Sequence, residues 1–413
     1  MSNSSWTIYN ATLAGREGRW RIDIAGDRIA RVAPADHAPV VRAPLASWDA
    51  QGQLVSSGFV DPHVHLDKCL TSERAPDAVA ATDLDAAIRA VRKLKSEFTV
   101  DDVAARATQA LEMGLAHGTT ALRTHCEADR FVGQRAIEGI GKAASAMTGR
   151  VDVQTLAFPQ EGWFDTPGAL EDGAGEWVQT ALKNGCRIVG GNVNQRLWPS
   201  DPEQQVDETF ALAARYNCDI DYHLDNWDSA DAFTLPYVAR KTMQQGWQGR
   251  VAVSHIASLA CVNDARAAQT IALVKAAGLH VCVLPTRMRL TRVTELMDAG
   301  VNVACGTDNM RDPFVRFGDA DPLKAMLLLA QITRQLHNAG LERIWKTMTT
   351  NAARMLRLPD YGIAAGCAAD LVVLQARSVP EAILLQSARL AVIKGGVQVA
   401  GSLPLGPVNA ALH

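Results

Sequence analysis

Eight short apolar runs, separated by segments with helical spacing, constrain the fold of this 413-residue chain more than any other feature. The runs span residues 58–65, 120–127, 151–160, 187–192, 219–225, 251–256, 280–285 and 301–308. Between them, apolar residues recur at helical spacing, as in 102–117, 262–278 and 290–300. Eight strands that alternate with helices are typical of an α/β fold, the (β/α)₈ TIM barrel. A doubly wound sheet is the competing fold, but no glycine-rich phosphate loop follows the first run.

The two ends of the chain have a different pattern. Short strand-like pieces occur in residues 6–13, 19–25 and 28–32, and again in 370–374, 390–394 and 397–400. Neither end is long enough to build a core alone. We therefore expect residues 1–54 and 365–413 to pair as one small β-sandwich beside a barrel domain of residues 55–364. Residues 84–98 predict one additional helix after the first strand of the barrel.

Composition and charge exclude several classes of partner. A net charge of −3 argues against nucleic acid or an anionic membrane as the main partner. No apolar run approaches the length of a membrane span, and the N-terminal residues lack the pattern of a signal peptide. The eight cysteines include no Cys-x-x-Cys pair, which argues against a zinc knuckle and a disulfide framework. We expect a cytoplasmic protein.

Histidines gather at the ends of the predicted strands. Five of the ten histidines lie at or near a C-terminal strand end, and Asp308 ends the eighth strand; the histidines are His63, His65, His125, His223 and His255. His63 and His65 point to the same face because they are two positions apart on one strand. In a barrel these strand ends share one face, where active sites are built. Histidines that only filled the core would ignore strand ends, so the pattern predicts a metal site for Zn²⁺ or Fe²⁺.

The same constellation resembles the amidohydrolase superfamily. The resemblance implies that the metal is bound by four residues, His63, His65, His223 and Asp308. It also implies that His255 lies beside the attacking water. Superfamily members with two metal ions usually carry a lysine or glutamate at the end of the fourth strand. Residues 188–192 read Ile-Val-Gly-Gly-Asn and contain neither, so we expect one divalent metal ion, Zn²⁺ or Fe²⁺.

Within the superfamily, the chain resembles the cytosine deaminase-like group along essentially its whole length. Residues 157–162, Ala-Phe-Pro-Gln-Glu-Gly, are similar to the segment with which that group reads its substrate, which implies a substrate contact for Gln160. An amide offers a donor and an acceptor side by side and suits a cyclic –CO–NH– edge. The alternative is that Gln160 only caps a loop. Residues 65–68, 189–191, 219–223 and 308–312 are similar to members that remove an alkylamine from an s-triazine.

One residue departs from the pattern of the group. Cytosine deaminases carry a glutamate, three residues after the strand-five histidine, that shuttles a proton to the ring; here the residue is Asn226. An amide cannot donate and accept a proton in a catalytic cycle, so cytosine itself is a doubtful substrate. We expect Asp308 to move the proton from water to the leaving nitrogen, with His255 orienting the reactants. Asp225 is a candidate substitute for the shuttle.

Five further residues are expected to contact the substrate together with Gln160. Lys68, Asn226 and Asn309 offer polar groups near the strand ends. Trp163 and Phe314 offer aromatic walls for a ring, with packing alone as the alternative.

The chain is therefore predicted to be a metal-dependent hydrolase that cleaves an exocyclic C–N bond of a nitrogen heterocycle, such as a pyrimidine or an s-triazine. The alternative is an amidohydrolase that cleaves a cyclic or acyclic amide with the same site. A third reading is a barrel without catalysis that serves in assembly, and the complete set of predicted ligands argues against it. The family resemblance also implies a homo-oligomer.

Overall fold

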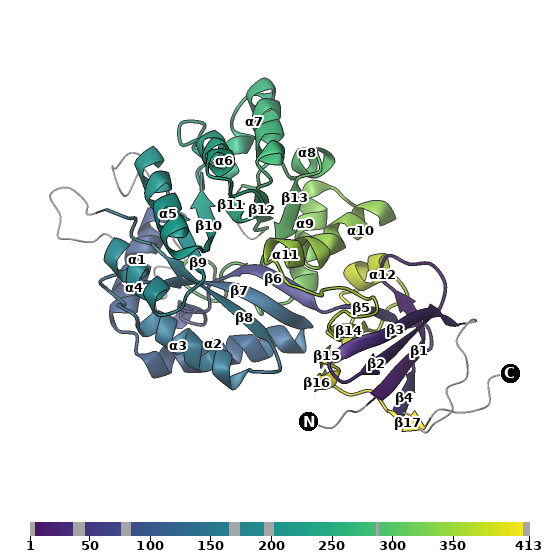
Figure 1. The fold of residues 1–413 in the computed structure, drawn as a ribbon. Helices are drawn as coiled ribbons and strands as arrows, with labels where there is room; N and C mark the ends of the chain where they lie inside the picture. The colour runs from purple at the N-terminus through teal and green to yellow at the C-terminus, as the bar shows by residue number, and fades with distance from the viewer. Residues whose placement is uncertain are drawn as a thin grey trace.

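The fold is taken from a computed structural model, which describes residues 5–35, 46–75, 84–164, 174–193, 202–285 and 289–407. Two bodies are visible in Figure 1: a large ring of strands surrounded by helices, and a smaller sheet beside it that combines both ends of the chain.

The ring is a (β/α)₈ barrel, as predicted. Its strands are β6 (Phe59–Val64), β7 (Thr119–Glu127), β8 (Asp152–Phe158), β9 (Ile188–Asn192), β10 (Asp219–Leu224), β11 (Val251–His255), β12 (His280–Val283) and β13 (Asn302–Cys305). They pair in parallel in sequence order. A parallel bridge between Val64 and Asp308 joins the segment after β13, the last strand, to β6, the first. All eight predicted runs therefore form strands of one sheet.

Helices alternate with these strands on the outside of the barrel (Figure 1). They are α2 (Val100–Ala116), α3 (Arg135–Ala146), α4 (Gly175–Lys183), α5 (Pro202–Tyr216), α6 (Leu235–Gln244), α7 (Asp264–Ala276), α8 (Val293–Asp298), α9 (Pro322–Thr333), α10 (Asn338–Thr347) and α11 (Thr350–Met355). The α2 helix begins where the Thr99 side chain accepts the N–H of Asp102, and α7 begins with the same kind of cap at Asn263. The helix predicted after the first strand is α1 (Leu84–Ser96).

Strands from both ends of the chain form the second sheet, as predicted. Its order is β16-β15-β14-β5-β1-β2-β3, with β4 and β17 attached through β1. The N-terminal part contributes β1 (Ser5–Leu13), β2 (Trp20–Ala25), β3 (Arg28–Pro34), β4 (Ala46–Asp49) and β5 (Leu54–Ser57). The C-terminal part contributes β14 (Leu371–Leu374), β15 (Arg389–Lys394), β16 (Val397–Gly401) and β17 (Gly406–Pro407), and helix α12 (Val379–Leu384) lies between β14 and β15.

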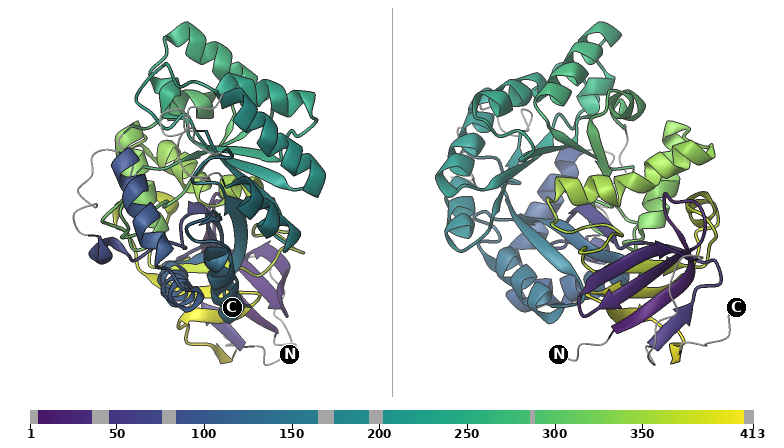
Figure 2. Two further views of the ribbon diagram at one scale, coloured as in Figure 1. Left: turned by 90° about the vertical axis from the view of Figure 1, so that its left-hand side faces the viewer. Right: turned by 45° about the vertical axis from the view of Figure 1, so that its right-hand side comes forward.

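One hydrophobic cluster holds the second sheet together. Ile8 and Ile22 from the N-terminal strands are fully buried in it beside Leu371 and Ile393 from the C-terminal strands. Figure 2 shows this sheet packed against one side of the barrel. The pairing of the two ends thus has a core, whereas the exact domain boundaries at residues 54/55 and 364/365 stay a prediction.

Two expectations from composition have counterparts in the structure. Within the described ranges, no helix has both the length and the apolar character needed to cross a membrane. All eight cysteines lie in described segments and are free thiols, five of them buried.

Candidate active site

Backbone pairing between the first and last strands brings the predicted ligands together. The N–H of Asp308 donates to the carbonyl of His63 at 2.9 Å, and the N–H of His65 donates to the carbonyl of Asp308 at 3.2 Å. Gly306 permits this approach, because a Cβ at that position would lie 2.7 Å from the carbonyl oxygen of His63. Main-chain hydrogen bonds therefore hold three of the four predicted ligands, His63, His65 and Asp308, next to one another.

The four predicted donors converge at the C-terminal end of the barrel. Asp308 Oδ1 lies 3.5 Å from Nε2 of both His63 and His65, and His65 Nε2 lies 3.2 Å from His223 Nε2. Ligands bound at 2.0–2.1 Å in tetrahedral geometry lie about 3.4 Å apart, so these distances fit one divalent ion. Three imidazoles and a carboxylate suit Zn²⁺ or Fe²⁺. Their assignment as ligands stays a prediction that the geometry supports.

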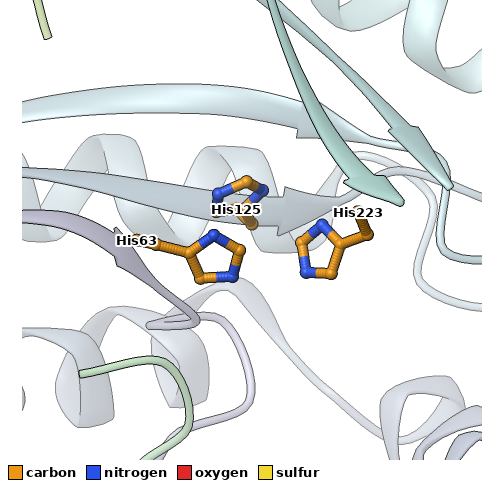
Figure 3. Close-up of side chains that lie close together, drawn as sticks. All are labelled: His63, His125 and His223. Atoms are coloured by element: carbon orange, nitrogen blue, oxygen red, sulfur yellow. The ribbon is translucent and has the colours of Figure 1, made fainter. Parts of the chain in front are cut away.

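His125, noted at a strand end but given no role from the sequence, lies in the same cluster. Figure 3 shows its ring between those of His63 and His223, and the ring centroids are 3.9 and 4.7 Å away. Neither of its ring nitrogens has a hydrogen-bond partner within the described part of the chain. Burial, reinforced by the charge of neighbouring groups, lowers the pKa of His125 and of His223 well below the ordinary value. Both rings are therefore neutral, the form that binds a metal.

A chain of polar contacts orients His63. Its Nδ1 lies 2.9 Å from Ser254 Oγ, and Ser254 in turn hydrogen-bonds Asp221. Arg123 donates to the same carboxylate at 2.8 Å. Such second-layer partners fix the tautomer that leaves Nε2 available to a metal. His255 follows Ser254, and its ring centroid lies 5.1 Å from that of His223.

A pocket opens directly beside this cluster. Its lining includes seven of the residues predicted to bind metal or substrate, together with four residues that carried no such prediction. The lining residues are His65, Lys68, Ile88, Gln160, Asn192, Val193, His223, Asn226, Trp227, Asn309 and Phe314. Polar groups and aromatic rings thus face one enclosed space next to the donors, the arrangement expected of a small-molecule site.

Trp163 does not line the pocket. Its side chain is buried, and its indole N–H donates to Thr209 Oγ1 at 2.8 Å. The aromatic residue that lines the pocket beside Phe314 is Trp227. The sequence alone does not show which of the two tryptophans lines the pocket, because that depends on how the loops after β8 and β10 fold.

Two of the polar pocket residues are held by neighbours. The Asn192 side chain donates to the carbonyl of Gln160 at 2.9 Å. The Asn309 amide donates to Asp312 at 2.7 Å, and Asp312 also accepts the N–H of Phe314 at 2.8 Å. Burial raises the pKa of Asp312 to about 6. The polar residues and the aromatic wall are therefore set by fixed hydrogen bonds.

Lys68 is buried beside the metal cluster and points its ammonium toward three groups. Nζ lies 2.7 Å from Glu127, 3.4 Å from Asp67 and 3.1 Å from His65 Nδ1. If Nε2 of His65 faces a metal, Nδ1 carries the proton and cannot accept one from an ammonium. The donors of Lys68 then go to the two carboxylates and to the pocket that the residue lines.

Asp225, the candidate substitute for the shuttle, does not serve the pocket. Its carboxylate accepts the backbone N–H groups of Thr234 and Leu235 at 2.8–3.0 Å. These hydrogen bonds hold the backbone at the start of α6. Burial raises the pKa of Asp225 to about 7. Asn226 lines the pocket instead.

A parallel (β/α)₈ barrel with a His/Asp donor cluster at its C-terminal face defines a metal-dependent hydrolase of the amidohydrolase kind. The sequence profile of the amidohydrolase family matches residues 165–400, and the chain belongs to this family. It is a hydrolase of C–N bonds, as predicted.

Similar proteins cover almost the whole chain. The N-isopropylammelide isopropyl amidohydrolase of Pseudomonas sp. (strain ADP) is 34% identical over 395 residues, which cover 94% of this chain and 95% of that one. The pterin deaminase of Rhizobium rhizogenes (strain K84) is 30% identical over 419 residues, with 96% and 92% covered. The crystal structure of 5-methylcytosine deaminase from Klebsiella pneumoniae with 5-fluorocytosine superposes with a TM-score of 0.87 at 27% identity, covering 96% and 97%.

Proposed function

We propose that this protein is a metal-dependent aminohydrolase that removes an amino or alkylamino group from a nitrogen heterocycle such as an s-triazine or a pyrimidine. The observation that carries the proposal is the pocket. Side-chain amides, an ammonium and aromatic rings line it together with the predicted ligands His65 and His223. The similar proteins support it, because their names refer to ammelide, pterin and methylcytosine rings.

His63, His65, His223 and Asp308 would hold one Zn²⁺ or Fe²⁺ ion. When bound, such an ion lowers the pKa of water so that hydroxide is available near neutral pH. Asp308 accepts the proton of the attacking water at its carboxylate and delivers it to the leaving nitrogen. His255 orients the water and the ring carbon that it attacks. Asp308 and His255 would thus carry out C–N hydrolysis without a glutamate proton shuttle, whose position is occupied here by Asn226.

The remaining pocket residues would select a flat ring with a lactam edge. The side-chain amide of Gln160 pairs with a –CO–NH– edge through one donor and one acceptor. Lys68 and Asn309 offer further donors to ring carbonyls, and electron-withdrawing carbonyls make the attacked carbon more electrophilic. Phe314 and Trp227 cover the faces of the ring.

Turnover of a heterocycle panel by the metal-loaded protein tests the proposal. The panel holds ammelide, N-alkylammelides, cytosine, isocytosine, creatinine and several cyclic amides, with products identified by mass spectrometry. We expect an amine or ammonia to be lost from an aminated ring, with one equivalent of Zn²⁺ or Fe²⁺ bound per chain.

The matched variants separate the site from its surroundings. His223→Ala removes a predicted ligand and should abolish both metal binding and turnover. Trp163→Phe removes an indole that contacts Thr209 outside the pocket, and should leave KM unchanged. Hydrolysis of the cyclic amides alone would contradict the proposal and support the amide-cleaving alternative.

We further propose that the protein forms a homo-oligomer in the cytoplasm. Large apolar side chains are 40–68% exposed on α9 and α12, two helices that pack together, and in the residues that follow them: Leu328, Ile332, Leu336, Leu384 and Leu385. Exposed patches of this kind mark contact surfaces. Light scattering should give a multiple of the chain mass, and Leu385→Lys should reduce it; a monomer at micromolar concentration would contradict the proposal.

The free cysteines agree with a reducing compartment.

A further inference from the structure

A cluster of buried charges adjoins the pocket residue Lys68, outside the predicted metal ligands. At its centre is Lys95, whose ammonium donates to Glu127 at 2.6 Å, to Glu161 at 2.6 Å and to Asp129. All four side chains are at most 2% exposed. A buried ammonium normally loses its charge, but these three carboxylates hold the pKa of Lys95 well above its ordinary value.

The three carboxylates have the spacing of a cation site, and the lysine occupies it. Their oxygens lie within 4.8 Å of one another. Lys95 Nζ is within hydrogen-bond distance of all three. Lys68 also pairs with Glu127, and Arg92 pairs with Glu161, so the positive charges that face the carboxylates come from side chains of this chain. The cluster is therefore a fixed internal ion network.

This network joins one helix to the ends of two strands. Lys95 is in the last turn of α1, the helix inserted after the first barrel strand. Glu127 ends β7, and Glu161 follows β8 by three residues. Arg92, one turn earlier on α1, also donates to Glu161 through Nε at 3.1 Å.

Both arms of the network end at proposed substrate contacts. On one arm, Glu127 accepts Lys95 with Oε2 and Lys68 with Oε1, the latter at 2.7 Å. On the other arm, Glu161 is the immediate neighbour of Gln160. The same helix also places Ile88 in the pocket lining. A shift of the Lys95 ammonium would therefore move an ammonium, an amide and an apolar wall that all face one ligand.

We propose that Lys95 is a positioning residue that sets Lys68, through Glu127, and Gln160, through Glu161, for recognition of the carbonyl-rich edge of the substrate. This inference rests on the proposed function. Lys95 does not line the pocket, and its ammonium bonds three carboxylates that are not predicted metal ligands, so its effect falls on substrate recognition.

Three substitutions on α1 test the role. Lys95→Met removes the central charge and should raise KM for the preferred heterocycle at least tenfold, while the metal content stays at one equivalent. Arg92→Met removes a half-buried cationic partner of Glu161 and should raise KM several-fold. Lys93→Met removes the same kind of charge from an exposed position of the helix and should change nothing. Lys95→Arg, which keeps the charge, should recover part of the loss.

The readouts distinguish this role from a merely structural one. Calorimetric binding of the ring product, which has no leaving group left at the attacked carbon, should weaken in parallel with KM when it is measured on metal-loaded protein. If Lys95→Met does not fold, Arg92→Met carries the test, because its guanidinium is 31% exposed and pairs with Glu161. If Lys95→Met and Arg92→Met both keep wild-type turnover and an unchanged KM, the inference about Lys95 is overturned, whereas the proposed function stands. Absence of both turnover and heterocycle binding in the wild type would overturn the proposed function and the inference with it.

Discussion

Asn226 is the residue at which the proposed chemistry departs from that of cytosine deaminases. It lines the pocket, and Asp225, the carboxylate beside it, is committed to the backbone of Thr234 and Leu235. Among the described pocket-lining residues, none is an aspartate or glutamate. In the proposed mechanism the proton therefore passes through Asp308, which favours substrates whose leaving group needs no prior protonation of the ring.

Asn226→Glu should introduce the missing shuttle. A carboxyl at this position can carry a proton to a ring nitrogen, and general acid–base catalysis contributes roughly 10²–10⁴-fold. We expect kcat/KM for cytosine to rise at least about tenfold. Asn226→Gln, which lengthens the side chain without a carboxyl, is the control. Rapid cytosine turnover by the wild type would show that the inference from Asn226 is wrong.

Glu127 gives a second prediction at the scale of one residue, on stability against pH. Burial alone would raise its pKa, but Lys68 and Lys95 hold that pKa at about 2, below the ordinary 4.5. A carboxyl with a lowered folded-state pKa stabilises the fold fully above pH 4.5, and this stability is lost as the pH falls toward 2. Between pH 6.5 and pH 3 the loss is about 2 kcal/mol.

Urea unfolding of the metal-free protein at both pH values measures this contribution. The free energy of unfolding of the wild type should fall by about 2 kcal/mol more than that of Glu127→Gln. Equal pH dependence in the two proteins would mean that Glu127 is not held in its charged form by the two lysines.

Residue-level prediction from sequence worked where the strand ends determine the position. His63, His65, His223 and Asp308 converge because parallel strands deliver their ends to one face. Lys95 could not be found in this way, since its partners are 32, 34 and 66 positions distant and no periodicity links them. The choice between Trp163 and Trp227 depends in the same way on the path of loops.

At the scale of elements, the site depends on how closely β6 approaches the segment after β13. Gly306 lies where this approach leaves no room for a side chain: a Cβ would lie 2.7 Å from the carbonyl oxygen and 2.8 Å from the Cβ of His63. The backbone bonds between His63 and Asp308 are formed in the same place.

Gly306→Ala should therefore displace two predicted ligands together. We expect affinity for Zn²⁺, measured by competition with a chelator, to fall by about tenfold or more, as it does when the supports of metal ligands are altered. Gly141→Ala is the control, since a Cβ on this α3 residue meets nothing within 4 Å. Unchanged affinity in Gly306→Ala would show that the ligands do not depend on this strand pairing.

The elements themselves were well determined by sequence pattern. Each apolar run became a barrel strand, and the additional helix appeared as α1 (Leu84–Ser96). The pattern indicated that α1 exists but not where it packs, because Lys95 bonds residues at or after the ends of two distant strands and Ile88 lines the pocket. Its contribution to the pocket therefore became visible only in three dimensions.

At the scale of the whole molecule, Lys394 ties the second sheet to the barrel. Its ammonium bonds Asp152 of β8 at 2.5 Å and Asp370, just before β14, at 2.6 Å. The sequence predicted that both chain ends would share a sheet because neither could form a core alone. It could not predict this contact, whose partners lie 242 and 24 positions away.

Lys394→Met should destabilise the fold without changing the site. We expect the free energy of unfolding to fall by about 1–2 kcal/mol, because Asp370 loses a largely buried cationic partner. KM and metal content should stay as in the wild type, since Lys394 lies outside the pocket lining. Arg28→Met, which breaks an exposed pair with Asp360, should cause no measurable loss. A changed KM in Lys394→Met would indicate that the second sheet acts on the site.

The most direct test of the central claim is hydrolysis of an N-alkylammelide by the metal-loaded enzyme in ¹⁸O-labelled water, followed by mass spectrometry of both products. The proposed reaction predicts a ring product that carries one ¹⁸O atom in place of the amine, together with a free, unlabelled alkylamine. A product that retains the alkylamine and gains the mass of one labelled water would mean that the ring amide opens instead, and would contradict exocyclic C–N cleavage.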